Sequence, residues 1–74
     1  MERDDMIKAK IKFFFDKTIM IHLEKEDGQF YNGTITEIKE DYLILKDRKV
    51  GECFVFFQEI TKIEQYQQHY GSKF

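Results

Sequence analysis

The stretch that decides the fold runs over residues 18–38 and reads TIMIHLEKEDGQFYNGTITEI. Its first part alternates apolar side chains, such as Ile21 and Leu23, with other side chains. A period of two is the pattern of a half-buried β-strand. The Asp27-Gly28 dipeptide that follows is a strong signal for a hairpin turn. The stretch therefore predicts two antiparallel strands joined by a tight turn.

The second strand of this hairpin carries Gly33 in its middle, within a run that includes Tyr31, Ile35 and Ile38. Glycine inside a strand usually marks a bend, a bulge or a close approach of another backbone. A strand of about ten residues that bends in this way lets a small sheet curl into a barrel. We therefore expect a strongly bent sheet that closes on itself.

On either side of this hairpin, the sequence predicts a helix before it and three strands after it. Ile7, Ile11 and Phe14 recur at helical spacing, and Asp4 and Asp5 offer capping chemistry at the start. The predicted elements are a helix at about 4–15 and strands at about 18–25, 29–39, 42–47, 52–57 and 60–65. The fold class is thus mainly β: a short helix, then a five-stranded antiparallel barrel with the helix over one open end. Residues 1–66 form a single domain, and the polar, aromatic remainder over 67–74 is expected to be a partly disordered tail.

Composition limits the function classes. The chain has 74 residues, and its single cysteine excludes an internal disulfide. Twelve basic and 14 acidic residues give a net charge of −2, which argues against coating nucleic acid by bulk charge but leaves a local basic patch open. The acidic start lacks the features of a signal peptide, and no apolar run approaches the ~20 residues that span a membrane. We expect a cytoplasmic protein without membrane contact.

The fourth predicted strand contains five consecutive apolar residues, 53–57. Phe54 and Phe56 should point to one face of the sheet, and Cys53, Val55 and Phe57 to the other. In so small a barrel the outer face has nothing of its own chain to lie against. An exposed apolar strand is an aggregation hazard unless another copy covers it. The pattern therefore predicts self-association through this strand.

Chemistry-bearing side chains do not form a catalytic or metal-binding pattern. His22 and His69 are far apart, and Cys53 lies in an apolar strand where a thiol behaves as a small hydrophobe. Acidic residues flank turns, with no cleft predicted between them. We expect no enzyme, no cofactor and no metal. Lys8 and Lys12 share one helix face, which is either a solvated face or a phosphate-contacting one.

Residues 17–65, about two-thirds of the chain, resemble an Sm-like domain, the family of the Sm, LSm and bacterial Hfq proteins. The resemblance rests on apolar and glycine positions more than on chemistry. The matching residues are Ile19, Ile21, Leu23, Gly28, Tyr31, Gly33, Ile35, Ile38, the run 42–45, Gly51, the run 53–57, Ile60 and Ile63.

The resemblance implies a homo-oligomeric ring of six or seven subunits, in which the fourth strand of one subunit pairs with the fifth of the next. The interface would then include Phe54, Val55, Phe56, Phe57, Ile60 and Ile63. It also implies binding of single-stranded RNA, with a base stacked on a residue of the loop after the second strand. Two stretches depart from the family: residues 39–43 (KEDYL) lack the Asn that reads uracil, and residues 56–58 (FFQ) replace the Tyr-Lys-His of Hfq. Val50-Gly51 stands where Sm proteins have Arg-Gly.

The candidate RNA-binding residues are Tyr42, Lys46, Arg48 and Lys49. Tyr42 is either a stacking platform for a base or a half-buried strand residue. The three cations share one loop, and around a ring they would concentrate positive charge. The leading hypothesis is therefore an Sm-like ring that contacts single-stranded RNA. The alternative is a protein-interaction or scaffold barrel of the same fold that does not bind RNA.

Overall fold

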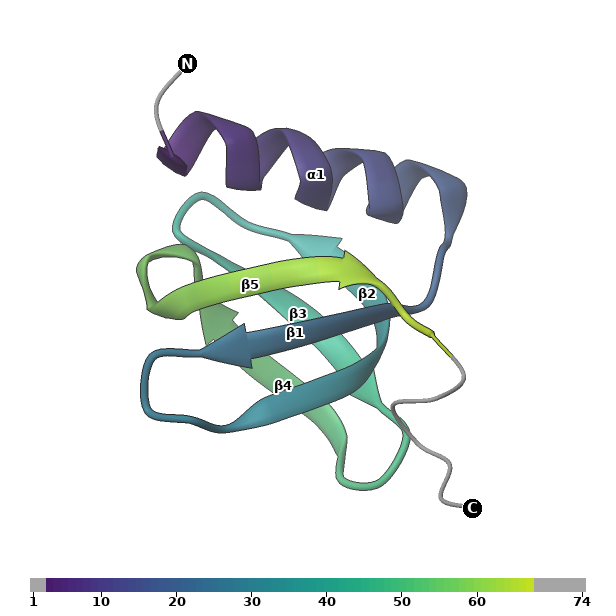
Figure 1. The fold of residues 1–74 in the computed structure, drawn as a ribbon. Coiled ribbons are helices and arrows are strands. Elements are labelled where there is room, and N and C mark those ends of the chain that lie inside the picture. Colours follow the sequence, from purple (N-terminus) through teal and green to yellow (C-terminus); the bar gives the residue numbers. More distant parts are fainter. Residues whose placement is uncertain (1–2, 68–74) are drawn as a thin grey trace.

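The computed structural model describes residues 3–67 as one helix followed by five strands (Figure 1). The elements are α1 (Arg3–Lys17), β1 (Ile21–Lys25), β2 (Phe30–Ile38), β3 (Tyr42–Asp47), β4 (Gly51–Phe56), the 3₁₀ turn η1 (Phe57–Glu59) and β5 (Ile60–Gln65). The predicted bounds of β3 and β5 are confirmed. Most of the predicted tail lies outside the described residues. Within the described part of the chain, α1 is too short and too polar to cross a membrane.

The end of α1 explains why the first strand begins later than predicted. Thr18 adopts a left-handed backbone conformation with φ of 55°. Its N–H donates to the Phe15 carbonyl oxygen at 3.1 Å, and the N–H of Ile19 donates to that of Phe14 at 3.0 Å. This is a Schellman-type helix end, at which glycine is the usual residue. The predicted strand start at residue 18 is therefore wrong, because residues 18–20 leave the helix before β1 begins at Ile21.

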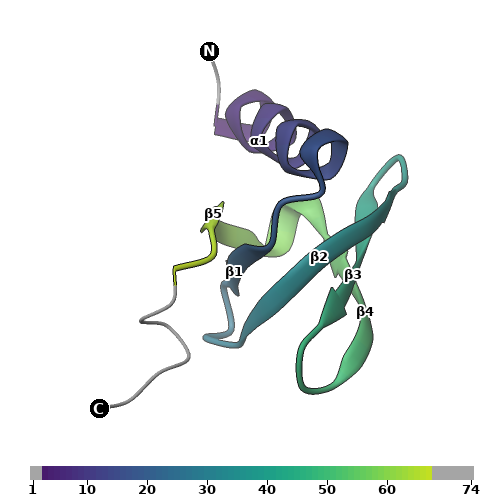
Figure 2. The same ribbon diagram turned by 90° about the vertical axis from the view of Figure 1, so that its right-hand side faces the viewer.

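The sheet is antiparallel, and its strand order is β4-β3-β2-β1-β5. The predicted helix and five antiparallel strands are confirmed, but the predicted closure into a barrel is wrong. Within residues 3–67, β4 and β5 are the two edges of the sheet and do not pair with each other. The chain passes from one edge to the other through η1 without pairing them, and α1 covers the open end of the curled sheet (Figures 1 and 2).

The predicted bend in β2 comes from two features that lie close together. The register against β3 shifts between Ile35 and Glu37, which is a β-bulge. Two residues earlier, Gly33 pairs with Asp47, and a Cβ atom at Gly33 would overlap the carbonyl group of Lys46. Glycine is therefore required at position 33 by the close approach of β3, and the bulge follows just beyond it.

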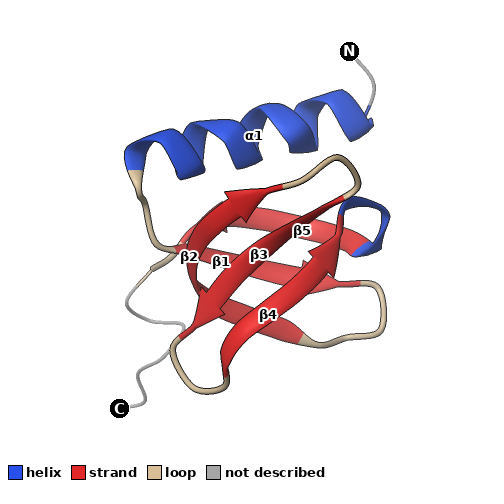
Figure 3. Cartoon of the chain, turned by 180° about the vertical axis from the view of Figure 1, so that it is seen from behind, coloured by secondary structure: helices blue, strands red, loops and turns tan. Residues whose placement is uncertain are grey.

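The core lies inside the curled sheet. Figure 2 and Figure 3 show β3 and β4 facing β1 and β5 across it, with α1 above. Ile11 and Phe14 of α1 reach into this space and close it. The core consists of Ile11, Phe14, Ile21, Leu23, Ile35, Leu43, Leu45, Val55, Ile60 and Ile63. Ile44 is also buried but does not belong to this cluster, because it points to the outer face of β3.

Candidate functional site

A groove lies where α1, the β2–β3 turn and η1 meet. It consists of two adjoining hollows of about 250 Å³ each. Apolar side chains and charged or amide side chains both line it: Ile7, Lys8, Ile11, Lys12, Ile38, Lys39, Glu40, Asp41, Phe57 and Gln58. Each hollow is below the ~300 Å³ at which sites for drug-sized ligands begin. The groove therefore suits one small flat group better than a large ligand.

Backbone hydrogen bonds bring these three segments together. The N–H of Phe57 donates to the Asp41 carbonyl oxygen at 3.0 Å, which ties η1 to the β2–β3 turn. The N–H of Lys39 donates to the Tyr42 carbonyl oxygen at 2.7 Å and keeps that turn tight. From α1, the Lys8 ammonium lies 5.7 Å from the centre of the Phe57 ring, within the range of a cation–π contact. One wall of the groove thus comes from each segment.

Three lysines line the groove, and each has a different environment. Lys39 Nζ lies 2.8 Å from Glu37 Oε1, and this hydrogen bond raises the pKa of Lys39. Lys12 Nζ lies 3.0 Å from Asp16 Oδ2 on the exposed side of α1. Lys8 lies over the Phe57 ring. Surface ion pairs of this kind are worth little, so Lys12 and Lys39 can turn to an anionic ligand at small cost.

Tyr42, the predicted stacking residue, does not line the groove. It is half-buried on the outer face of the sheet, where its ring centre lies 5.9 Å from that of Phe54 and 5.3 Å from that of Phe56. Tyr42 is thus a half-buried strand residue, and its use as a stacking platform for a base stays a prediction. Its exposed neighbours form an aromatic patch with it, defined as Tyr42, Phe54 and Phe56.

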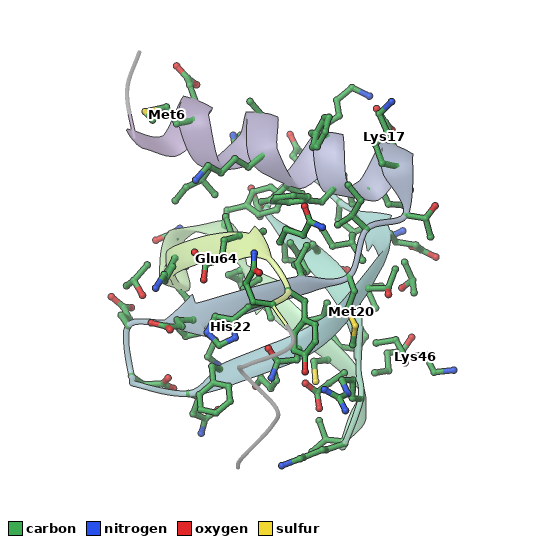
Figure 4. All side chains as sticks on the ribbon, turned by 45° about the vertical axis from the view of Figure 1, so that its right-hand side comes forward. Met6, Lys17, Met20, His22, Lys46 and Glu64 are labelled. Carbon is green, nitrogen blue, oxygen red and sulfur yellow. The ribbon has the colours of Figure 1, made fainter. Side chains whose placement is uncertain are left out.

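The three predicted cations lie toward the far end of β3 from Tyr42. Lys46 is exposed on β3 and points into solvent, as Figure 4 shows. Arg48 and Lys49 are exposed in the β3–β4 turn. Five strand residues separate Tyr42 from the start of that turn, which is about 17 Å at the usual rise. The structure therefore does not unite Tyr42 and the loop cations in one site within a single chain.

Asp47 organises the β3–β4 turn. Its carboxylate accepts hydrogen bonds from the backbone N–H groups of Asn32, Lys49 and Val50, at 2.8, 2.8 and 3.0 Å. Burial would raise the pKa of Asp47, but these three bonds outweigh it and hold the pKa below its ordinary value. Arg48 then extends away from the turn and donates from Nη1 to the Tyr66 hydroxyl.

The predicted alternation of β4 is confirmed. Phe54 is 56% and Phe56 is 46% exposed on the outer face, whereas Val55 is fully buried in the core. Of the other predicted interface residues, Ile60 and Ile63 are also in the core, and Phe57 packs partly against it and lines the groove. Among the predicted interface residues, Phe54 and Phe56 alone present exposed side chains on the outer face.

His22 occupies the outer face of β1, as predicted, yet only 4% of it is exposed. Its Nδ1 lies 2.6 Å from Asn32 Oδ1, and its Nε2 lies 2.9 Å from Glu24 Oε2. The hydrogen bond to His22 lowers the pKa of Glu24. Glu64 lies opposite His22 on the neighbouring strand β5 (Figure 4). Among residues 3–67, no group of three or more His, Cys, Asp or Glu side chains is placed to hold a metal ion.

Sequence reasoning missed the groove as a site, although it singled out several of its parts. Lys8 and Lys12 were open to interpretation as phosphate contacts, and residues 39–41 and 56–58 marked departures from the Sm-like family. Their convergence depends on the path of η1, which carries no sequence signal of its own. The comparisons add no family: no protein-family model matches the chain, and no curated protein matches it.

Proposed function

We propose that the protein is an Sm-like RNA-binding domain that takes a base of single-stranded RNA into the groove between α1, the β2–β3 turn and η1. One observation carries the proposal. The turn after β2, where the resemblance implies a stacked base, and residues 57–58, which fall where Hfq carries its Tyr-Lys-His pattern, both line this groove. They reach it from separate parts of the chain, and α1 adds cations beside them.

The groove offers the three kinds of contact that a nucleotide needs. Ile38 and the Phe57 ring provide apolar and aromatic surface for a flat base. The Asp41 carboxylate and the Gln58 amide provide an acceptor and a mixed donor–acceptor group for the base edge. Lys8 leaves the Phe57 ring and contacts a phosphate when a base takes its place. Stacking of one base on an aromatic ring is worth ~1–3 kcal/mol.

Local charge supports this location despite the net charge of −2. Residues 3–17, which form α1, contain five basic and three acidic residues. The rest of the chain is therefore more acidic than the total suggests. A polyanion is attracted to α1 and repelled by the remainder, so we expect binding to be confined to the groove side and to depend on salt.

The test is a titration of labelled oligo-U and oligo-A with the protein at several salt concentrations. The Lys8→Ala, Lys12→Ala variant should bind more weakly, and its log–log salt slope should be shallower by about 1.4 if both lysines contact phosphates. Arg48→Ala, Lys49→Ala is the matched control, because it removes the same charge from the far end of β3. If the control loses binding and the Lys8 and Lys12 variant does not, the β3–β4 turn is the site and the groove is not.

Phe57→Leu tests the stacking contact separately from charge. Leucine keeps the apolar contact with the core, so the fold should remain, while loss of ~1–3 kcal/mol of stacking should weaken binding about 5- to 150-fold. The salt slope should not change. If the wild-type protein shows no salt-dependent binding even at low salt, the protein-interaction alternative replaces this proposal.

A further inference from the structure

We infer that a second copy of this chain pairs with the β4 edge, β4 against β4, so that two molecules join their sheets about a two-fold axis. This inference does not depend on RNA binding. It also differs from the ring that the Sm-like resemblance implies, in which β4 would pair with β5 of a neighbour. Three features of the two sheet edges support it.

The first feature is that β4 lacks the usual protections of an edge strand. Its six residues, GECFVF, include one charged residue, Glu52, and neither lysine nor proline. Within the described chain, β4 has β3 on one side and no strand on the other. Its backbone groups on the free side can therefore continue the ladder into another chain.

The second feature is the aromatic patch on the outer face of this edge. Phe54 and Phe56 share that face with Tyr42, because residues paired across antiparallel strands point the same way. Phe54 lies opposite the buried Ile44 of β3, yet is itself more than half exposed. The patch thus continues to the very edge of the sheet, where an added strand would extend it.

The third feature decides which edge of the second copy fits. On β5 the outer face carries Lys62 and Glu64, which pair with Glu24 and His22 of β1. Pairing β4 with β5 would place these charged groups beside exposed phenylalanines. Pairing β4 with β4 about Phe54 places Phe54 beside Phe54 of the second copy, with Phe56 diagonal to that pair and opposite Glu52; β5 offers no such aromatic pair on its outer face. The self-complementary edge is therefore β4.

A ladder centred on Phe54 pairs residues 52–56 of the two copies and places Phe56 opposite Glu52 of the second copy. It sets Phe54 opposite Phe54 of the second copy, with Phe56 diagonal to that pair and within reach of an aromatic side chain. Two half-exposed phenylalanines contribute roughly 200 Å² per molecule, given the ~150–250 Å² of an aromatic side chain. This is well below the ~800 Å² per partner of a standard interface, so we expect a weak, concentration-dependent dimer.

Sedimentation equilibrium over a wide range of protein concentrations tests the inference without RNA. The mass should rise with concentration from 9.0 kDa, the mass of one chain, to twice that value and no further. The Phe54→Ser, Phe56→Ser variant should remain at the mass of one chain. Phe30→Ser is the matched control, since Phe30 is 57% exposed on β2, away from the β4 edge, and its replacement should leave the dimer intact. Far-UV circular dichroism verifies that each variant is folded.

Cross-linking tests the two-fold register. In a Cys53→Ser background, Phe54→Cys should form a disulfide-linked dimer under mild oxidation, because residue 54 meets itself across the axis. Phe30→Cys in the same background should not. A monomer at every concentration, a mass of six or more chains, or a dimer that the double serine variant retains would each overturn the inference. Absence of the cross-link in a dimer would overturn the β4–β4 pairing.

Discussion

Replacement of Gly33 by alanine should be the most damaging small substitution in the sheet. An alanine Cβ at this position would lie 2.7 Å from the carbonyl carbon of Lys46 and 2.9 Å from the Cα of Asp47. Ordinary carbon contacts are ~3.5–4.0 Å, and the obstructing atoms belong to backbone, which has no rotamer to change. β2 and β3 must therefore separate at this point.

The expected cost follows from two effects of that separation. Overpacking in a well-packed region costs ~1–3 kcal/mol, and a rigid obstacle puts this case at the upper end. Separation also strains neighbouring bonds, including the 2.9 Å bond from the Arg48 N–H to the Asn32 carbonyl oxygen, at ~1 kcal/mol each. The sum is about 3–4 kcal/mol. A chain of this length has a total stability of about 4–11 kcal/mol, so the loss amounts to between about a third and nearly all of it.

Thermal and urea denaturation followed by far-UV circular dichroism measures the loss. Gly33→Ala should lower Tm by about 12–32 °C, at ~4–8 °C per kcal/mol for a domain of this size. Gly28→Ala is the control: Gly28 has a positive φ of 90° but open space around it, so alanine there pays only the left-handed penalty of ~1–2 kcal/mol. If Gly33→Ala costs no more than Gly28→Ala, the close approach of β3 does not constrain this position.

Two further predictions concern the helix end and the β3–β4 turn. Thr18→Gly should stabilise the protein by about 0.5–1 kcal/mol. Glycine removes a left-handed penalty of ~1–2 kcal/mol at φ 55°, but it also increases the conformational entropy of the unfolded chain. Urea denaturation measures the change, and a loss of stability would contradict backbone strain at Thr18. Asp47 has a folded-state pKa below its ordinary 3.8, so its stabilising effect is complete above that value and disappears as the pH falls through the folded pKa. The Tm difference between wild type and Asp47→Asn should therefore shrink in strong acid, and a pH-independent difference would exclude this role of the carboxylate.

The sequence by itself determined which residues face inward and where most strands lie. Alternation and turn chemistry are local properties, so the Asp27-Gly28 turn, the bounds of β3 and the opposite directions of Phe54 and Val55 followed from short stretches. The helix end was missed because the sequence carries no local signal for it. Thr18 gives no sign of a left-handed residue, since this conformation is typical of glycine, and only the packing of α1 on the sheet imposes it.

Closure of the sheet and position of the groove were decided by the tertiary structure alone. Whether two edges pair depends on how the whole sheet curls and on where η1 takes the chain, and neither is encoded in a period of two. Tyr42 follows directly after the residues that line the groove, yet its side chain lies on the outer face of β3 against Phe54 and Phe56. Lys8, Asp41 and Phe57 become neighbours only because backbone bonds and core packing hold three distant segments together. Contacts between distant segments follow from the assembled fold, and no local pattern carries them.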